Sequence, residues 1–385
     1  MNKRLVSFIL FFSIFLSVYG LLNYYIFSRG LPVVPQEDRV WYSVLFWGLA
    51  VSFPAGRFLE RVSLSWVSSS LVWVGSYWLA AFAYFVLSLL AIDTLRLLNF
   101  IVPIFPSVLT ADPAETVRIV GFTVAGGVFL TLLAGHFNAR NPRIKVLNLT
   151  IPKNSHAAKS LHIAVVSDIH LGTIVCKWRL EHIVEKINAL DPDIVLLPGD
   201  VVDEDLGPVI KQNLGETLRT IKSRHGVFAI TGNHEYIGGV EEACQYLAEH
   251  GIEVLRDKTV KILDSIYVVG REDRSISQFS ANKRKDLEEL MLGIDRSLPI
   301  ILMDHQPFRL EEAEQHGVDL QLSGHTHHGQ LWPFNFITKK VYELSWGYKQ
   351  KGNTQYYVSC GVGTWGPPIR TGNKPEIVSM RLKFE

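Results

Sequence analysis

A run of 31 consecutive residues without a charged side chain, residues 62–92, restricts the possible folds of this chain more than any other feature. An α-helix rises about 1.5 Å per residue, so a segment of this length can cross the ~30 Å hydrocarbon core of a bilayer. Similar uncharged segments lie at residues 5–27, 40–56 and 119–137. We therefore predict an all-α transmembrane domain over residues 1–140, with about four spans.

One of these segments, residues 5–27, and a further apolar segment, residues 97–110, are each compatible with a second interpretation. Residues 5–27 follow Lys3 and Arg4, as the apolar part of a signal peptide would, but the run is long for one and no small-x-small cleavage site ends it. We expect an uncleaved helix there. Residues 97–110 are apolar but few and contain two prolines, which indicates an interfacial or re-entrant segment.

The residues before the last span carry the signals of a helix start. Asp112 is suited to be the N-cap, Pro113 to be the first helical residue and Glu115 to lie in the first turn. Within this span, Gly121 and Ala125 leave room for close contact with another helix.

Positive charges flank the predicted spans unequally. One side has Lys3, Arg4, Arg57, Arg61, Arg140, Arg143 and Lys145, and the other has Arg29, Arg39, Arg96 and Arg118. By the positive-inside rule, this favours an integral protein of the inner or cell membrane with everything after residue 140 in the cytoplasm. A fifth span through residues 97–110 would reverse that orientation.

The overall charge and the cysteines exclude two classes of protein. Lys and Arg number 38 against 37 Asp and Glu, so no electrostatic attraction to nucleic acid is expected. The three cysteines, Cys176, Cys244 and Cys360, form neither a CxxC site nor a disulfide framework.

After a predicted linker at residues 141–160, the pattern changes to short apolar runs alternating with amphipathic stretches over residues 161–385, as in α/β proteins. The predicted strands are residues 161–166, 194–197, 227–230, 299–302 and 318–322. Each strand is followed by side chains of a kind that binds metals, which are Asp168 and His170, Asp200, Asn233, His305, and His325 with His327. Because α/β folds place their sites at the carboxyl ends of strands, we expect these side chains to converge.

The last of these loops packs three histidines, His325, His327 and His328, into four residues between two glycines. Histidines at i and i+2 cannot share a helix face, so we place them on a turn, which the glycines allow to be tight. We include His325 and His327 in the ligand set and leave His328 out. The complete set contains only oxygen and imidazole donors, which suits Mn, Fe or Zn. Seven ligands are too many for one ion and suit two divalent ions that share a carboxylate.

In this order the motifs resemble those of the calcineurin-like metallophosphoesterase superfamily: Asp168-x-His170, Gly199-Asp200, Gly232-Asn233-His234-Glu235, His305 and Gly324-His325-x-His327. The resemblance covers about residues 160–330, and membrane-attached bacterial members, a group that includes UDP-2,3-diacylglucosamine hydrolases, are the nearest likeness. It implies a four-layer α/β sandwich with two mixed sheets between helices.

The resemblance also implies roles for single residues. Asp168, His170 and His327 would hold the first metal, and Asn233, His305 and His325 the second. Asp200 would bridge the two metals. His234 would face the substrate phosphate and stabilise or protonate the leaving oxygen.

Three other groups of residues lie near these motifs in the sequence. Asp203 is expected in a solvated acidic loop, with a role next to the ligands as the alternative. Arg370 follows a Trp-Gly-Pro-Pro turn and is either part of a rigid turn or directed towards a phosphate or lipid head group. Residues 331–340 combine three aromatic side chains with two lysines, which is typical of a segment at a membrane interface, although packing in the core is an equal alternative.

The predicted function is a membrane-bound phosphohydrolase that cleaves a phosphoester or pyrophosphate bond, on a lipid-linked substrate. Two alternatives remain open. A membrane-anchored protein phosphatase would use the same chemistry on another substrate. A non-catalytic sensor that binds phosphate or nucleotide would be expected to have lost ligands, and none is missing here.

Overall fold

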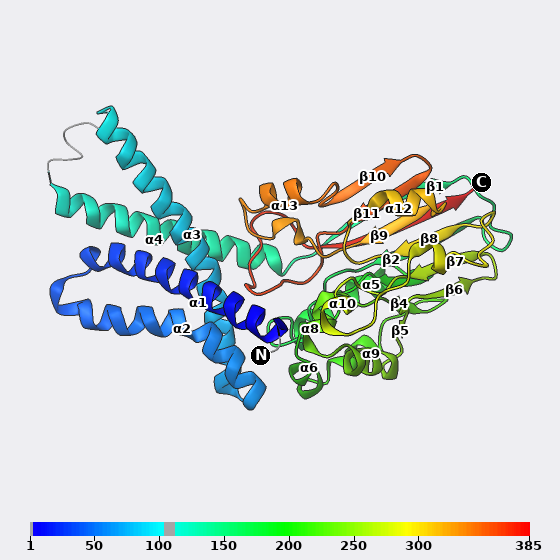
Figure 1. Ribbon diagram of the computed structural model, residues 1–385, viewed down its shortest axis with the longest axis horizontal. Coiled ribbons are helices and arrows are strands. Elements are labelled where there is room, and N and C mark those ends of the chain that lie inside the picture. The colour runs from blue at the N-terminus through cyan, green and yellow to red at the C-terminus, as the bar shows by residue number, and fades with distance from the viewer. Residues whose placement is uncertain (1–2, 104–111) are drawn as a thin grey trace. The chain divides into compact units, whose positions relative to one another are not determined.

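The computed structural model describes residues 3–103 and 112–385. The chain divides into two compact units, Met1–Ala134 and Gly135–Glu385 (Figure 1). The first is helical, whereas the second contains all the strands that the structure describes.

The helical unit contains four long helices and two single 3-10 turns between the first two of them. They are α1 (Lys3–Gly30), η1 (Leu31–Val33), η2 (Gln36–Asp38), α2 (Arg39–Val62), α3 (Trp66–Ile101) and α4 (Pro113–Ala139). Helices α3 and α4 are long and apolar enough to cross a membrane. The four-span arrangement remains a prediction, and the predicted interfacial segment at residues 97–110 starts as the end of α3 and then leaves the described residues.

Local signals explain where α4 starts and how α2 and α3 pack. The Asp112 carboxylate accepts hydrogen bonds from the backbone N–H groups of Ala114 and Glu115, both at 3.0 Å, so the predicted cap is confirmed. Gly56 and Gly75 lie where a Cβ would collide with the backbone of the facing helix. These glycines allow α2 and α3 to approach closely, as small residues do between membrane helices.

The second unit contains two six-stranded mixed sheets. The first has the order β1 (Arg143–Ile151), β12 (Glu376–Phe384), β2 (Ser160–Val165), β3 (Ile194–Leu197), β4 (Val227–Ala229) and β5 (Glu253–Val254). The second has the order β10 (Gly347–Lys351), β11 (Thr354–Val358), β9 (Leu320–Ser323), β8 (Ile300–Met303), β7 (Ile266–Gly270) and β6 (Lys258–Ile262). In the first sheet all neighbouring strands are parallel except β12 and β2, which are antiparallel. In the second sheet the four inner strands are parallel and the two edge strands, β10 and β6, are antiparallel to their neighbours.

Short helices follow most of the strands. They are α5 (Lys177–Ala189), α6 (Gly207–Lys211), α7 (Leu214–Leu218), α8 (Asn233–Gly238), α9 (Val240–Glu249), α10 (Ile276–Phe279), α11 (Leu287–Leu290), α12 (Leu310–Gln315), η4 (His327–Gly329) and α13 (Asn335–Val341). Leu180, Ile183, Val184 and Ile187 of α5 recur at helical spacing and are buried, so they form the face that packs on the first sheet.

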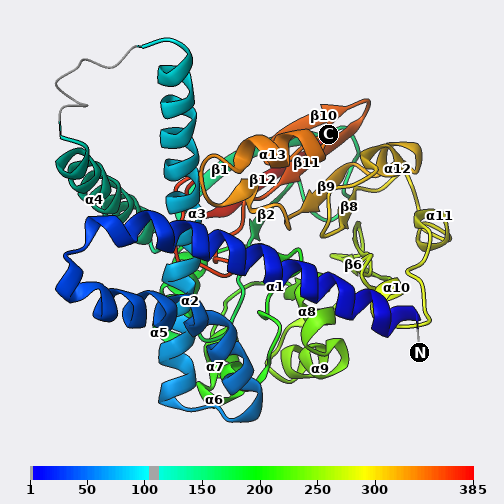
Figure 2. The ribbon, with the colours of Figure 1, turned by 60° about the vertical axis from the view of Figure 1, so that its left-hand side comes forward.

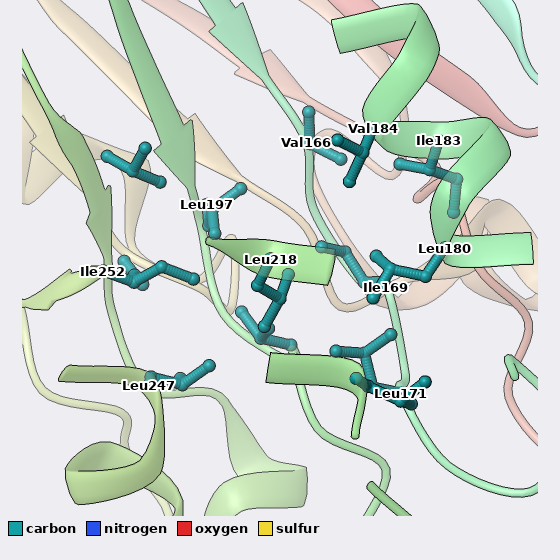
Figure 3. Close-up of a cluster of buried hydrophobic side chains, with 14 of the residues drawn as sticks. Val166, Ile169, Leu171, Leu180, Ile183, Val184, Leu197, Leu218, Leu247 and Ile252 are labelled. Atoms are coloured by element: carbon teal, nitrogen blue, oxygen red, sulfur yellow. The ribbon is translucent and has the colours of Figure 1, made fainter. Parts of the chain in front are cut away.

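Three apolar layers confirm the predicted four-layer sandwich. Side chains such as Ile163 and Leu322 fill the space between the two sheets. The outer face of the first sheet packs on α5, α7 and α9, where Leu180 and Leu247 belong to one buried cluster (Figure 3). The outer face of the second sheet packs on α11 and α12. Figure 2 shows α12 near β8.

One segment differs from the prediction. Nine of the 20 residues of the predicted linker at residues 141–160 form strand β1, which pairs in parallel with β12 along its whole length. Its alternation of Leu147, Leu149 and Ile151 with polar residues was a strand signal in the sequence.

Candidate metal centre

The seven predicted ligand residues lie together at the carboxyl ends of five strands, β2, β3 and β4 in one sheet and β8 and β9 in the other. They are Asp168 and His170, Asp200, Asn233, His305, and His325 with His327. Five of them are buried, and Asn233 and His325 are partly exposed. The sandwich therefore directs two sets of parallel strand ends to one point.

One group of potential ligands consists of Asp168, His170 and His327. The Nε2 atoms of the two imidazoles are 3.0 Å apart. An oxygen of Asp168 is 3.6 Å from the same nitrogen of His327. Their ligand atoms all lie within 4.8 Å of one another, which is close enough to surround one ion.

A second group consists of Asp200, His305 and His325. The Asp200 Oδ2 atom is 3.1 Å from Nε2 of His305, and Nδ1 of His325 is 2.8 Å from the amide oxygen of Asn233. The same Asp200 oxygen is 3.8 Å from Nε2 of His170. Asp200 thus lies between the two groups.

Two of the histidine contacts suit metal ligation better than they suit hydrogen bonding within the protein. The ring of His305 donates from Nδ1 to the carbonyl of Pro198 at 2.7 Å, and its buried Nε2 has no hydrogen-bond partner. Metal-bound histidines commonly donate their second N–H to a carbonyl in this way. Because only one proton can lie between the facing Nε2 atoms of His170 and His327, a cation that accepts both lone pairs suits them better. The residues present therefore fit divalent ions.

The pKa values of the histidines also suit the binding of cations. Burial opposes a charge on His305, but the carboxylates of Asp200 and Asp168 raise its pKa well above the usual value. Burial and the neighbouring His305 lower the pKa of His325 to about 3, and burial and His170 lower the pKa of His327 well below its usual value. His325 and His327 are therefore neutral, as ligands must be. A cation would replace the proton that the carboxylates hold on His305.

Three glycines lie where these side chains leave no room for a Cβ atom. A Cβ on Gly232 would collide with the carboxylate of Asp200, and one on Gly324 with that of Asp168. At Gly199, which has φ +87°, a Cβ would lie 2.5 Å from Nδ1 of His305. The glycines of the motifs are thus required by the close packing of the ligand side chains.

The backbone of the site is held in uncommon conformations. Asp168, His170, Asp200, His325 and His327 all have positive φ angles, between 44° and 70°. Such a conformation costs ~1–3 kcal/mol per residue and persists where the surrounding structure imposes it, typically at functional sites. The strained loops fix the directions of the ligand side chains.

His234 occupies the first turn of α8, beside the ligand groups. Its backbone N–H donates to Asp200 at 2.9 Å, and its Nδ1 lies 3.2 Å from an oxygen of Asp203. Burial disfavours the charged ring, but the carboxylates of Asp200, Asp203 and Glu204 outweigh burial and raise the pKa of His234 to about 9. In this state the imidazole carries a proton that it can donate.

The sequence led us to expect Asp203 in a solvated loop, but the structure shows that it is buried. It is only 5% exposed, and one of its oxygens lies 3.4 Å from Nδ1 of His170 as well as beside His234. The acidic run 203–205 resembles a surface loop in sequence, because only the position of α8 makes Asp203 an inward-facing residue. The only sign in the sequence that Asp203 lies near the ligands was its position three residues after Asp200.

Arg370 is part of the structure that supports His327 and does not face a substrate. It is completely buried, and its guanidinium donates to the carbonyls of Cys360 and Gly363, both at 2.8 Å. Its Nη2 lies 3.2 Å from Nδ1 of His327. The predicted contact with a phosphate or head group is therefore wrong, and the rigid-turn alternative holds.

Asn373, which the sequence did not single out, binds the histidine loop directly. Its side-chain amide donates to the carbonyl of His327 at 2.6 Å. Asn138, in the last turn of α4, donates in turn to the carbonyls of Arg370 and Asn373, both at 2.8 Å. The segment 370–373 thus connects the end of α4 to a candidate ligand.

His328 points away from the ligand groups, consistent with its omission from the set. It is buried, its Nδ1 lies 3.0 Å from the Ser345 hydroxyl, and its ring packs on Trp346 with a centroid distance of 5.1 Å. This histidine stabilises the loop.

A pocket of about 460 Å³ opens over the ligand groups. Its polar lining residues include Asp200, Asn233, His234, His325, Thr326, His327, Gln330 and Thr338. Its apolar lining residues are Leu331, Phe334, Trp365 and Pro367. We call these two parts the floor and the rim of the pocket.

We include in the rim the exposed apolar side chains of Trp332, Phe336 and Ile337, the last two of which lie on α13. Trp332, Phe336, Ile337 and Trp365 are each more than half exposed, and Lys339 and Lys340 lie on the same short helix. The segment 331–340 is therefore mainly a surface feature, and the alternative of ordinary core packing is excluded for these exposed side chains.

Comparison with known proteins agrees with this geometry. Residues 161–329 match the family model described as calcineurin-like phosphoesterase. An uncharacterized metallophosphoesterase of Helicobacter pylori is 36% identical over 268 residues, which are 66% of this chain and 69% of that protein. A transmembrane protein with metallophosphoesterase domain from Danio rerio is 31% identical over 92% of this chain and 83% of its own length.

Among solved structures, NAD nucleotidase from Haemophilus influenzae superimposes with a TM-score of 0.36. The two chains are 15% identical over 54% of this chain and 46% of that one, and we base no argument on this similarity. The identity to the two sequence relatives is high enough, over enough of their length, to establish the family. The chain belongs to the calcineurin-like phosphoesterase family and is a metal-dependent phosphoesterase.

Proposed function

We propose that this protein is a membrane-bound phosphohydrolase that uses two divalent ions to cleave a phosphoester or pyrophosphate bond of a lipid-linked substrate. The observation that carries the proposal is the composition of the pocket, which combines a polar floor that contains metal-binding side chains with an apolar rim. A substrate that fits both parts has a phosphate group attached to an apolar group.

In this proposal Asp168, His170 and His327 would hold one ion, and Asn233, His305 and His325 would hold the other. Asp200 would be shared by the two ions. The distances of 3.1 Å and 3.8 Å from one Asp200 oxygen to His305 and His170 support the shared position. When bound, such a pair of ions lowers the pKa of a trapped water and neutralises charge on the phosphoryl group.

His234 supplies the proton for the leaving group. Its Nδ1 faces Asp203, which leaves Nε2 as the nitrogen available to a substrate in the pocket. Asp203 holds the ring in this orientation and favours its protonated state. A positioned general acid of this kind contributes typically ~10²–10⁴ in rate.

The apolar rim supports a lipid-linked substrate. Trp332, Phe336 and Ile337 are 55%, 55% and 58% exposed, and the adjacent lysines favour anionic head groups. Aromatic side chains beside lysines are characteristic of segments that lie at the membrane interface. On this basis the rim rests in the head-group layer and admits the phosphate of a lipid to the floor.

The membrane part of the proposal rests on the helical unit and on the distribution of charge. Two helices are long and apolar enough to span a bilayer, and the relative from Danio rerio is named a transmembrane protein. The excess of Lys and Arg on one side of the predicted spans supports a cytoplasmic catalytic unit in the inner or cell membrane.

A substrate screen tests the proposal. The full chain is purified in detergent, stripped of metal with a chelator and restored with Mn²⁺, Fe²⁺ or Zn²⁺. It is then assayed against a phosphomonoester, a phosphodiester, a nucleoside diphosphate lipid and a phosphopeptide. We expect metal-dependent hydrolysis with the highest kcat/KM for the lipid. Turnover of the phosphopeptide alone would identify a protein phosphatase, and metal binding without turnover of any substrate would identify a sensor.

A further inference from the structure

We propose that the helical unit contains a binding site for one anionic phospholipid, separate from the catalytic pocket. The site is a cavity of about 350 Å³ that is lined by residues of all four long helices. This volume lies within the range of ~300–1,000 Å³ that is typical of ligand sites. The proposal does not depend on the metal centre or on the substrate.

The walls of the cavity are almost entirely apolar. They include Ile26 of α1, Phe46 and Leu49 of α2, Trp78 and Phe85 of α3, and Val120 and Val124 of α4. Such a lining offers nothing to water, whereas an acyl chain can fill it without leaving polar groups unpaired. The walls therefore select the apolar part of an amphiphile.

Close contact at Gly121 explains how α4 closes the cavity. A Cβ atom on this residue would collide with the side chain of Val33 in η1. Gly121, Val33 and Ala125 all line the cavity. Because Gly121 has no side chain, the first half of α4 can lie directly against η1 beside the cavity.

One end of the cavity is charged, because Arg29, Asp93 and Arg96 line it together. Arg29 donates to the Asp93 carboxylate at 2.6 Å, and the hydroxyl of Tyr25 donates to the same oxygen at 2.6 Å. Arg96 is 3.8 Å from the other oxygen of Asp93, which is beyond hydrogen-bond range. Two guanidinium groups and one carboxylate leave a net charge of about +1 at this end.

The state of Arg96 points to an anionic head group. Its side chain is 50% exposed, and within residues 3–103 and 112–385 no hydrogen bond from its guanidinium is found. The planar fork of Arg donors matches phosphate oxygens, and basic pockets between membrane helices bind anionic lipid head groups. A phosphate at Arg96 with its acyl chain among the apolar walls satisfies both parts of the cavity. A zwitterionic lipid would bring a second cation to an end that already carries positive charge.

Thermal unfolding with defined lipids tests this site. The full chain in detergent is heated with phosphatidylglycerol or with phosphatidylcholine of the same acyl chains, and native mass spectrometry counts the lipids retained. We expect phosphatidylglycerol to raise the Tm by ~3 °C more than phosphatidylcholine does, with one lipid retained per chain. Arg96→Gln should abolish the difference between the two lipids.

Arg118→Gln is the matched control. Arg118 is a half-exposed arginine near the start of α4 that pairs with Glu115 and does not line the cavity, so this variant should behave like the wild type. Val120→Trp fills the cavity and should reduce retention of both lipids, which keeps the test decisive if Arg96→Gln folds poorly. Three outcomes would each overturn the proposal. The two lipids could raise the Tm of the wild type equally, or Arg118→Gln could lose the difference between the lipids as Arg96→Gln does. Val120→Trp could also retain as much lipid as the wild type.

Discussion

The floor and the rim of the catalytic pocket are only a few residues apart in sequence, yet they are built in opposite ways. The floor residue His327 is buried, has a positive φ angle and is held by Asn373 and Arg370. The rim residues Trp332 and Phe336 follow within ten residues and are more than half exposed. A metal ligand must be held within a fraction of an ångström, whereas a surface that receives lipid gains from mobile, exposed apolar side chains.

This contrast leads to different expectations for mutations in the two parts. Changes at the proposed metal ligands of the floor should affect every substrate equally, because the ions act on the phosphate itself. Changes in the rim should affect only substrates with an apolar group.

The largest effect is expected at the floor. Asp200→Asn and His325→Ala should each lower hydrolysis by ~10³ or more for all substrates, because each removes a ligand from the proposed ion pair. Metal content, measured by atomic emission on protein purified from membranes, should fall as well. Normal turnover at full metal occupancy in both variants would refute the assignment of two ions.

His234→Ala should keep both ions and lose ~10² or more in kcat, the usual size of a general-acid contribution. The loss should be smallest for a nitrophenyl ester, whose leaving group needs no proton, and largest for an alkyl phosphate. An equal loss with both esters would argue against protonation of the leaving oxygen and leave His234 a role in binding.

Asn373→Ala should weaken metal binding by ~10–100-fold, the usual cost of removing a partner that orients a ligand. Isothermal titration with Mn²⁺ measures this, and excess Mn²⁺ should restore kcat. Asn188→Ala is the matched control, since this asparagine also donates to a backbone carbonyl, that of Thr220, and does not line the pocket. Equal metal affinity in the two variants would show that Asn373 only supports the fold.

The smallest effect on chemistry is expected at the rim. Replacing Trp332, Phe334 and Phe336 with Ser should reduce turnover of a lipid substrate in vesicles by ~10-fold and spare a soluble nitrophenyl phosphate diester. Phe279→Ser, at another aromatic residue that is 51% exposed, should change neither activity. If both activities of the triple variant fall together with its Tm, the segment supports the fold and the contrast between floor and rim fails.

Much of the site could be inferred from residue order alone. Central parallel strands of a sheet end at a common edge, so the ligand-type residues after residues 161–166, 194–197 and 227–230 had to lie near one another. The same rule applies to the strands that precede His305 and His325. The four apolar segments and the cap at Asp112 likewise follow from local pattern, because helix length and capping depend on neighbours in sequence.

The properties that required the tertiary structure all depend on distant partners. Strand β1 pairs with β12, more than 200 residues later in the chain, so a short alternating segment looked like a linker. Asp203 is buried because α8 brings His234 beside it, and Arg370 is buried because the carbonyls of Cys360 and Gly363 accept its hydrogen bonds. Charged side chains are exposed unless such partners exist, and sequence spacing does not reveal partners that only folding brings together.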